Sequence, residues 1–378
     1  MILAVTAKHS ESAGAAPSIY SSFRLLKPFQ VLSHIRTKFR TSAQGARALT
    51  LMAHDKLQVV KSKPIWFGRT PRHLRTMSHG LVLDLATLGN GRLASVGEDR
   101  TIKIWNLRSR ELSGELSAPD GEVPGNFPLA TLGDGRLASG SSEDQIKIWN
   151  ISEDQWGTWG HAADHLVLLG HPDIQLDITL ALAALEGGRL ASTHIGSDLI
   201  YIWNLARGDC VAKLGESIDR HADSVSCLAA LEGGRLVSGS FDRKVKIWNV
   251  ADGACIATLT GHGRRVWALA ILESGRLASA SGDMTIRIWE IATGACVATL
   301  EGHRGSVRSL ALLNGRRLAS GSSDQTVKVW EVATGECLAT LRLADTVLAI
   351  APIPTSTAIA VASGNSISIH NLESLDSR

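Results

Sequence analysis

Residues 234–250 read GRLVSGSFDRKVKIWNV, and five other segments of the chain repeat this pattern in register. The copies begin at Gly91, Gly135, Gly188, Gly275 and Arg316, and each contains a tryptophan near its end. A weaker seventh copy, AIAVASGNSISIHNL (358–372), carries His370 at the tryptophan position. Self-similarity at a period of roughly 40 to 50 residues is typical of a fold that assembles its core from similar neighbouring units.

Each repeat is expected to form four short β-strands. In the sixth copy these are VRSLALL (307–313), RRLASGS (316–322), TVKVWEV (326–332) and ECLATLR (336–342), separated by turn residues. Their apolar runs are nearly continuous, which favours strands that are covered on both faces. A closed ring of such units covers both faces of every unit, because neighbours pack against one another.

Composition supports a folded chain with an uneven charge. Of the 378 residues, 44% are apolar and 20% are charged, and no apolar run approaches the ~18 residues that a transmembrane helix needs. Residues 1–77 contain 13 Lys and Arg but only 2 Asp and Glu, whereas the whole chain has a net charge of +3. The positive charge is therefore concentrated before the first repeat.

The repeats resemble the WD-repeat β-propeller family, in which a Gly-His pair precedes a Trp-Asp pair. This chain has Gly261-His262 and Gly302-His303, although Asn or Glu follows each repeat tryptophan. The resemblance implies an all-β fold, a seven-bladed β-propeller of four-stranded blades over residues 73–378, preceded by a separate basic segment, 1–72. It also implies that an N-terminal strand, HLRTMSH (73–79), completes the last blade and closes the ring.

Four copies contain His, Ser, Asp and Trp at matching offsets. Such a set could suggest nucleophilic catalysis, but an active site needs one constellation rather than one per repeat. In the family these side chains form a buried hydrogen-bond chain from the indole to the carboxylate, which stabilises the blade when every member is paired. The four sets are His79, Ser95, Asp99 and Trp105; His221, Ser238, Asp242 and Trp248; His262, Ser279, Asp283 and Trp289; and His303, Ser320, Asp324 and Trp330.

Other reactive residue types give no sign of chemistry in the sequence. No carboxylate or histidine cluster stands apart from the repeats, and no Cys and His spacing is typical of zinc sites. We therefore expect no enzyme activity, no metal and no cofactor. One repeat position in the outer strand holds Cys210, Cys255, Cys296 and Cys337, which a ring would keep too far apart for disulfides.

The resemblance further implies a partner-binding top face, formed by the loop before each inner strand and by the turn that contains the aspartate. Arginine side chains suit carboxylates and phosphates, so an acidic or phosphorylated peptide is the favoured partner, and a solvated rim without a ligand is the alternative. The predicted contact positions are Ser226, Trp267 and Arg308 on the inner strands and Glu98, Phe241, Gly282 and Ser323 in the turns. The same loops add Arg220, Arg243, Arg264, Arg265 and Arg304.

The N-terminal segment allows several interpretations. Residues 1–50 contain seven Ser, seven Lys and Arg and one acidic residue, a composition that resembles an organellar transit peptide. A basic arm that contacts nucleic acid or anionic lipid, and a tail without a role, are the alternatives. Without organellar import, the absence of a secretory leader predicts a cytoplasmic or nuclear location.

Together these features predict a non-catalytic protein–protein interaction scaffold that is monomeric by itself. One alternative is a substrate receptor of a cullin-type ubiquitin ligase, recruited through a ligase adaptor. Such receptors often carry a Trp-Asp-x-Arg motif, which Trp105-Asn106-Leu107-Arg108 resembles with Asn in place of Asp. Nucleic-acid binding through the basic arm is a less favoured alternative from a different functional class.

Overall fold

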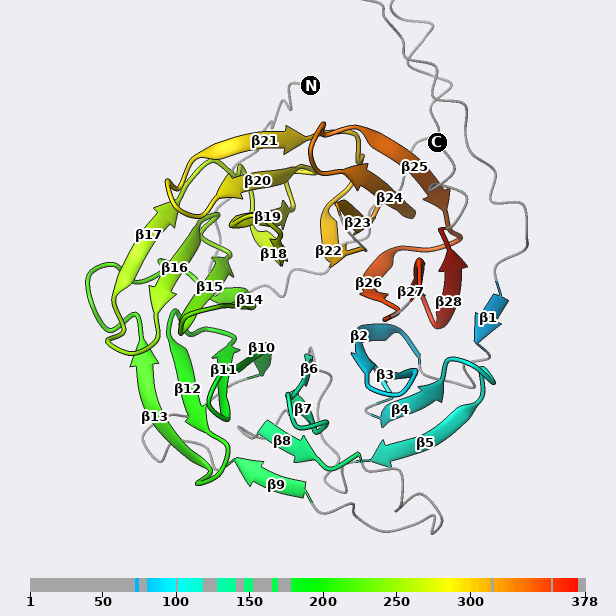
Figure 1. Cartoon of the computed structure of the whole chain (residues 1–378), viewed down its shortest axis with the longest axis horizontal. Helices are drawn as coiled ribbons and strands as arrows, with labels where there is room; N and C mark the ends of the chain where they lie inside the picture. The colour runs from blue at the N-terminus through cyan, green and yellow to red at the C-terminus, as the bar shows by residue number, and fades with distance from the viewer. Residues whose placement is uncertain are drawn as a thin grey trace, which may run out of the picture. The chain divides into compact units, whose positions relative to one another are not determined.

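A computed structural model describes residues 72–74, 80–99, 101–117, 128–140, 146–151, 165–168, 178–313, 316–354 and 356–372. Seven antiparallel sheets of four strands form a ring, and the innermost strand of each sheet faces its centre (Figure 1). This arrangement confirms the predicted seven-bladed β-propeller. The described residues contain no helix, and thus no helical segment among them is suited to cross a membrane.

The blades follow the repeats in chain order. Blade 1 consists of β2 (Val82–Leu88), β3 (Arg92–Gly97), β4 (Thr101–Asn106) and β5 (Leu112–Ser117). Blade 2 consists of β6 (Leu129–Thr131), β7 (Leu137–Gly140), β8 (Ile146–Trp149) and β9 (His165–Leu168). Blade 3 consists of β10 (Thr179–Leu185), β11 (Arg189–His194), β12 (Ile200–Asn204) and β13 (Asp209–Leu214). Blades 4 and 5 consist of β14 (Val225–Leu231), β15 (Arg235–Ser240), β16 (Val245–Asn249) and β17 (Cys255–Leu259), and of β18 (Val266–Leu272), β19 (Arg276–Ser281), β20 (Ile286–Glu290) and β21 (Cys296–Leu300). Blades 6 and 7 consist of β22 (Val307–Leu312), β23 (Arg317–Ser322), β24 (Thr326–Glu331) and β25 (Cys337–Arg342), and of β26 (Val347–Pro352), β27 (Ala358–Ser363), β28 (Ser366–Asn371) and β1 (Arg72–Leu74).

The glycines that begin the repeats occupy the turns between the first and second strands. Gly234 has φ +70° directly after Gly233 at φ +73°, and Gly91 has φ +69° after Asn90 at φ +60°. Two successive residues with positive φ are typical of tight hairpin turns, which glycine and asparagine tolerate best. The Gly-Arg-Leu pattern therefore marks the point where each inner strand turns back.

The core lies between the blades rather than inside any one of them. Trp248 on β16 packs with Ile200 and Ile202 of the preceding blade, and Trp330 on β24 packs in the same way with Ile286 and Ile288. Both indoles are almost fully buried. Because each of these tryptophans belongs to one blade and is covered by the preceding blade, a single blade could not bury its apolar faces alone.

Blade 7 combines the two ends of the propeller sequence. Strand β1 pairs antiparallel with β28, with His73 opposite Ser368. The predicted closing strand, 73–79, coincides with β1 only at its first two residues, and residues 75–79 lie outside the described residues. Closure of the ring by the whole segment therefore stays a prediction, as does the proposed division of the chain at residue 72.

The cysteines face the repeat tryptophans across the two outer strands. Cys255 pairs with Trp248, and the same register joins Cys210, Cys296 and Cys337 to the tryptophans of their own blades. All five cysteines of the chain, which include Cys227 on an inner strand, carry free thiols.

Candidate functional site

In blades 4, 5 and 6 the predicted His, Ser, Asp and Trp sets form continuous hydrogen-bond chains. In blade 4, Trp248 Nε1 donates to Ser238 Oγ at 2.7 Å, and Ser238 Oγ lies 2.8 Å from His221 Nε2. His221 Nδ1 lies 2.8 Å from Asp242 Oδ2. The chains that begin at Trp289 and Trp330 have the same connections at 2.7 to 2.9 Å.

The hydrogen-bond partners determine the protonation state of each chain. Asp242 is an acceptor, so His221 donates from Nδ1, and its neutral Nε2 accepts the proton of Ser238. Burial by itself raises the pKa of Asp242, but hydrogen bonds from His221 and two backbone N–H groups outweigh burial and lower the pKa to about 2. In blade 6 burial lowers the pKa of His303 despite the neighbouring Asp324, which favours the same neutral imidazole.

These serines are unsuited to nucleophilic attack. Ser238, Ser279 and Ser320 are fully buried, and each hydroxyl is held between an indole and an imidazole. A nucleophile has to reach a substrate carbonyl, and a hydroxyl enclosed in this way does not. The geometry thus supports a structural role for the repeated Ser, His and Asp residues.

The remaining blades use different polar partners. In blade 1, Trp105 donates to Ser95 at 2.8 Å and Lys103 lies 3.1 Å from Asp99, whereas His79 lies outside the described residues. In blade 3, Ser192 lies 3.0 Å from His194, two residues further along the same strand. The register of the repeats gave no indication of His194, because in the complete sets the histidine precedes the inner strand.

The aromatic and arginine residues predicted for the top face form a stacked ladder. The rings of Phe241 and Trp267 meet edge to face with centroids 5.3 Å apart. The guanidinium of Arg265 lies 4.3 Å from the Phe241 ring, and that of Arg308 lies 4.3 Å from the Trp267 ring. Blades 4, 5 and 6 each contribute to this Arg265–Phe241–Trp267–Arg308 ladder, which brings together positions up to 67 residues apart in the sequence.

The other predicted top-face residues do not belong to the ladder. Arg264, Arg304 and Glu98 are exposed, and the Glu98 carboxylate accepts the backbone N–H of Leu81 at 3.4 Å. Arg220 pairs with Asp198 at 3.3 Å, and Arg243 occupies a turn with φ +73°. Ser226 belongs to the inner wall, where its hydroxyl donates to the carbonyl groups of Gly239 and Val266. Gly282 and Ser323 follow strands β19 and β23 in the turns of blades 5 and 6.

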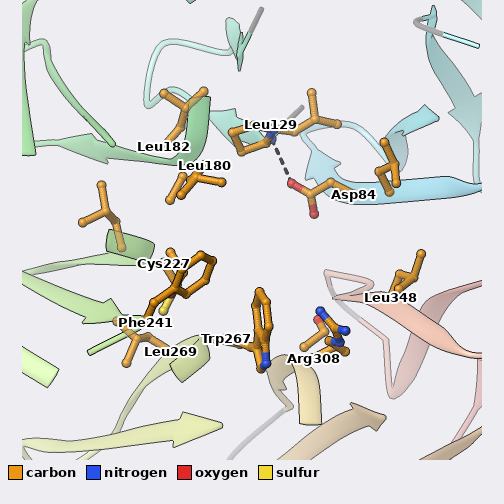
Figure 2. A pocket seen from close by; sticks show the side chains of 17 residues that line it. Asp84, Leu129, Leu180, Leu182, Cys227, Phe241, Trp267, Leu269, Arg308 and Leu348 are labelled. Carbon is orange, nitrogen blue, oxygen red and sulfur yellow. Dashed lines mark hydrogen bonds between the residues drawn. The ribbon is translucent and has the colours of Figure 1, made fainter. Parts of the chain in front are cut away.

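A cavity of about 290 Å³ occupies the channel beside the ladder. Figure 2 shows Arg308 and Trp267 on one side of it, Phe241 and Cys227 on another, and Asp84 opposite them. Leucines supply most of the remaining wall. Those leucines are Leu83, Leu129, Leu180, Leu182, Leu228, Leu269 and Leu348.

Asp84 is a carboxylate on the cavity wall that the repeat pattern does not predict. It lies on inner strand β2, where the corresponding residues of blades 4 to 6 are Cys227, Ala268 and Ser309. Burial raises its pKa to about 6, although the backbone N–H groups of Leu129 and Leu85 oppose this by donating to it at 2.8 Å. The signal was present in the sequence, since VLDLATL interrupts an otherwise apolar strand with one charge.

The Trp105-Asn106-Leu107-Arg108 segment forms a turn at the end of β4. The Asn106 side chain accepts the backbone N–H groups of Arg108 and Ser109, and Arg108 is exposed. Asn204 accepts two backbone N–H groups in the equivalent turn of blade 3. Asparagine after the tryptophan therefore stabilises a turn in more than one blade.

Among the described residues, no group of three or more His, Cys, Asp or Glu side chains is arranged to hold a metal ion.

The sequence model of one family, described as WD domain, G-beta repeat, matches residues 71–106, 209–249, 253–290 and 294–331. No curated protein gives a significant match to the chain. The four matched segments contain the three inner strands of blade 1 and of the three blades with complete hydrogen-bond chains. The sheet topology identifies the other three blades.

Proposed function

Because the chain belongs to the WD-repeat β-propeller family, we propose that it is a non-catalytic scaffold that binds a protein partner at the Arg265–Phe241–Trp267–Arg308 ladder. Propellers of this family typically serve as protein-interaction scaffolds, and the partner is chosen by residues outside the repeat pattern. The ladder is the observation that carries the proposal. It concentrates two aromatic rings and two guanidinium groups that the interblade cores do not use.

The chemistry of the ladder favours an acidic or phosphorylated peptide as the partner. Each aromatic ring has an arginine on its face, an arrangement that holds the guanidinium in place while its edge remains available for hydrogen bonds. Arg308 Nε has no hydrogen-bond acceptor among the described residues, and burial lowers the pKa of this arginine. A carboxylate or phosphate beside the guanidinium would offset the cost of desolvating the charge of Arg308.

Affinity capture with the full-length chain tests this proposal. Partners recovered with the wild-type protein are compared with those recovered by Trp267→Ala and Arg308→Gln, and folding is checked by thermal unfolding. Arg316→Glu is the matched control, because Arg316 is an exposed arginine immediately before β23, at the opposite end of that strand from Ser323. A partner lost from both ladder variants and kept by the control supports the proposal, whereas unchanged capture by all variants contradicts it.

A second proposal is a role as a substrate receptor of a cullin-type ubiquitin ligase. Its support is the exposed Arg108 in the turn that follows Trp105. Recovery of a ligase adaptor by the wild-type chain, and its loss with Arg108→Asp, would distinguish this role from simple scaffolding. Arg207→Asp, in the equivalent turn of blade 3, is the matched control.

Nucleic-acid binding and organellar import both involve residues outside the described part of the chain and stay predictions.

A further inference from the structure

The cavity contains two opposite charges that do not pair with each other. Among the described residues, no ion pair joins Asp84 to Arg308, and Arg308 Nε has no acceptor. Each Asp84 oxygen accepts one backbone N–H, which leaves room for a further donor at each oxygen. Isolated charges are costly to remove from water, so this wall is suited to a ligand that satisfies both.

The order of the blades determines how the two charges are separated. Asp84 belongs to blade 1 and Arg308 to blade 6, and blade 7 stands between them with Leu348 on the cavity wall. Figure 2 shows Leu348 between the two charged side chains. The inner strands that carry the two residues belong to different sheets, and among the described residues the two side chains form no ion pair with each other. A bridging ligand therefore needs an apolar spacer that covers Leu348.

We propose that the central cavity binds a small zwitterion, with its ammonium group on Asp84, its carboxylate on Arg308 and a short alkyl chain across Leu348. The wall combines leucine side chains with a few polar groups that converge on one space, a combination that small-molecule sites use to orient a ligand. The volume of about 290 Å³ suits a ligand the size of an amino acid. Phe241, Trp267 and Arg308 of the ladder also line this cavity, so the small-molecule site goes beyond the proposed protein-binding role while sharing three residues with it.

Three linear probes of similar length separate the contribution of each charge. δ-Aminovalerate carries both charges, glutarate carries two negative charges, and cadaverine carries two positive charges. Calorimetric titration of the full-length protein is expected to show δ-aminovalerate binding at least tenfold more tightly than either of the others. Glutarate would place a carboxylate against Asp84, and cadaverine would place an ammonium group against Arg308, so each loses one attraction and gains one repulsion.

Variants of the cavity wall complete the test. Asp84→Asn and Arg308→Met are each expected to weaken δ-aminovalerate binding at least tenfold. Arg316→Met is the matched control, since Arg316 is an exposed arginine immediately before β23 and does not line the cavity. This control should stay within threefold of the wild type. The proposal is wrong if the three probes bind equally, if no probe binds below about 10 mM, or if the Asp84→Asn variant retains wild-type affinity. Partner capture is not involved, so the proposed scaffold function stands or fails separately.

Discussion

Asp84 accepts the backbone N–H of Leu129 at 2.8 Å and so joins the inner strands of blades 1 and 2. Ser309 accepts the N–H of Ile350 between blades 6 and 7 in the equivalent place. One repeat position thus links neighbouring blades by side-chain-to-backbone hydrogen bonds. In blade 1 the linking group is a carboxylate, which introduces a charge where the other blades have none.

Replacing Asp84 with asparagine is expected to stabilise the protein at neutral pH. The folded-state pKa of about 6 lies above the ordinary value of 3.8, so ionisation favours the unfolded state progressively as pH rises from about 4 to 6. The pKa difference corresponds to at most about 3 kcal/mol at pH 7. The neutral amide avoids this cost and keeps an acceptor for Leu129, and the loss of the second acceptor, which serves the N–H of Leu85, offsets part of the gain. Urea unfolding of both proteins at pH 4 and pH 7 measures the change. A stability difference that does not depend on pH would contradict the raised pKa of Asp84.

The hydrogen-bond chain of blade 4 should depend on its central hydroxyl. Ser238→Ala removes the acceptor of Trp248 and the donor to His221, and leaves two buried polar groups unpaired. We expect a loss of roughly 2 to 4 kcal/mol in the free energy of unfolding, measured in urea at neutral pH. Ser323→Ala, in a partly exposed turn of blade 6, should change it by less than about 0.5 kcal/mol.

Asp324 should make the protein sensitive to acid. Burial opposes its ionisation, but hydrogen bonds from Thr326, the backbone N–H of Arg304 and His303 prevail and lower its pKa to about 2. A lowered folded-state pKa contributes stability above pH 4 that is lost as pH falls towards 2, here about 2 kcal/mol. Asp324→Asn should therefore be less stable than the wild type at pH 7, with the difference shrinking towards pH 2. Chemical unfolding curves recorded at several pH values measure this difference. If Asp324 were buried but unpaired, burial would raise its pKa, and Asp324→Asn would be more stable than the wild type at pH 7.

Gly239 is expected to tolerate no side chain. A Cβ at this position of β15 would lie 2.6 Å from Cys227 Sγ and 2.6 Å from Val266 Cγ1, inside the interface between blades 4 and 5. Gly239→Ala should cost about 1 to 3 kcal/mol, because a packed core accommodates an added methyl only by moving. Ala280 holds the same position in blade 5, so Ala280→Gly is the control and should cost no more than about 1 kcal/mol. Thermal unfolding of the two variants, side by side, provides the comparison.

The cysteines should differ widely in their reactivity towards thiol reagents. Cys227 is buried, and burial raises its pKa to about 12, so it should resist alkylation in the native protein. Cys296 is exposed on outer strand β21 and should react first. Mass spectrometry of peptides after brief iodoacetamide treatment measures the order. Early modification of Cys227 would show that the channel wall opens readily.

The repeats by themselves determined the propeller, since similar segments fold into similar blades and apolar strands without polar faces need neighbours on both sides. They also identified the members of the three complete hydrogen-bond chains, because Ser238 and its equivalents stand at constant offsets from histidine, aspartate and tryptophan. The repeat offsets do not predict the contacts of residues that depart from the repeat. His194, which reaches Ser192 from within the same strand, follows no offset that the other blades share.

Closure of the ring determines side-chain contacts that the repeat pattern does not predict. The sequence predicted Phe241, Trp267 and Arg308 as surface positions, but their stacking depends on the angle between blades 4, 5 and 6, which no local pattern encodes. The sequence likewise contains Asp84 and Arg308 as two ordinary charged residues 224 positions apart. Only the closed ring brings them to one cavity, because blade 7 follows blade 6 and lies beside blade 1. A repeat determines how each blade folds through local strand pairing, whereas the central cavity is lined by one to four residues of every blade and exists only once all seven are assembled.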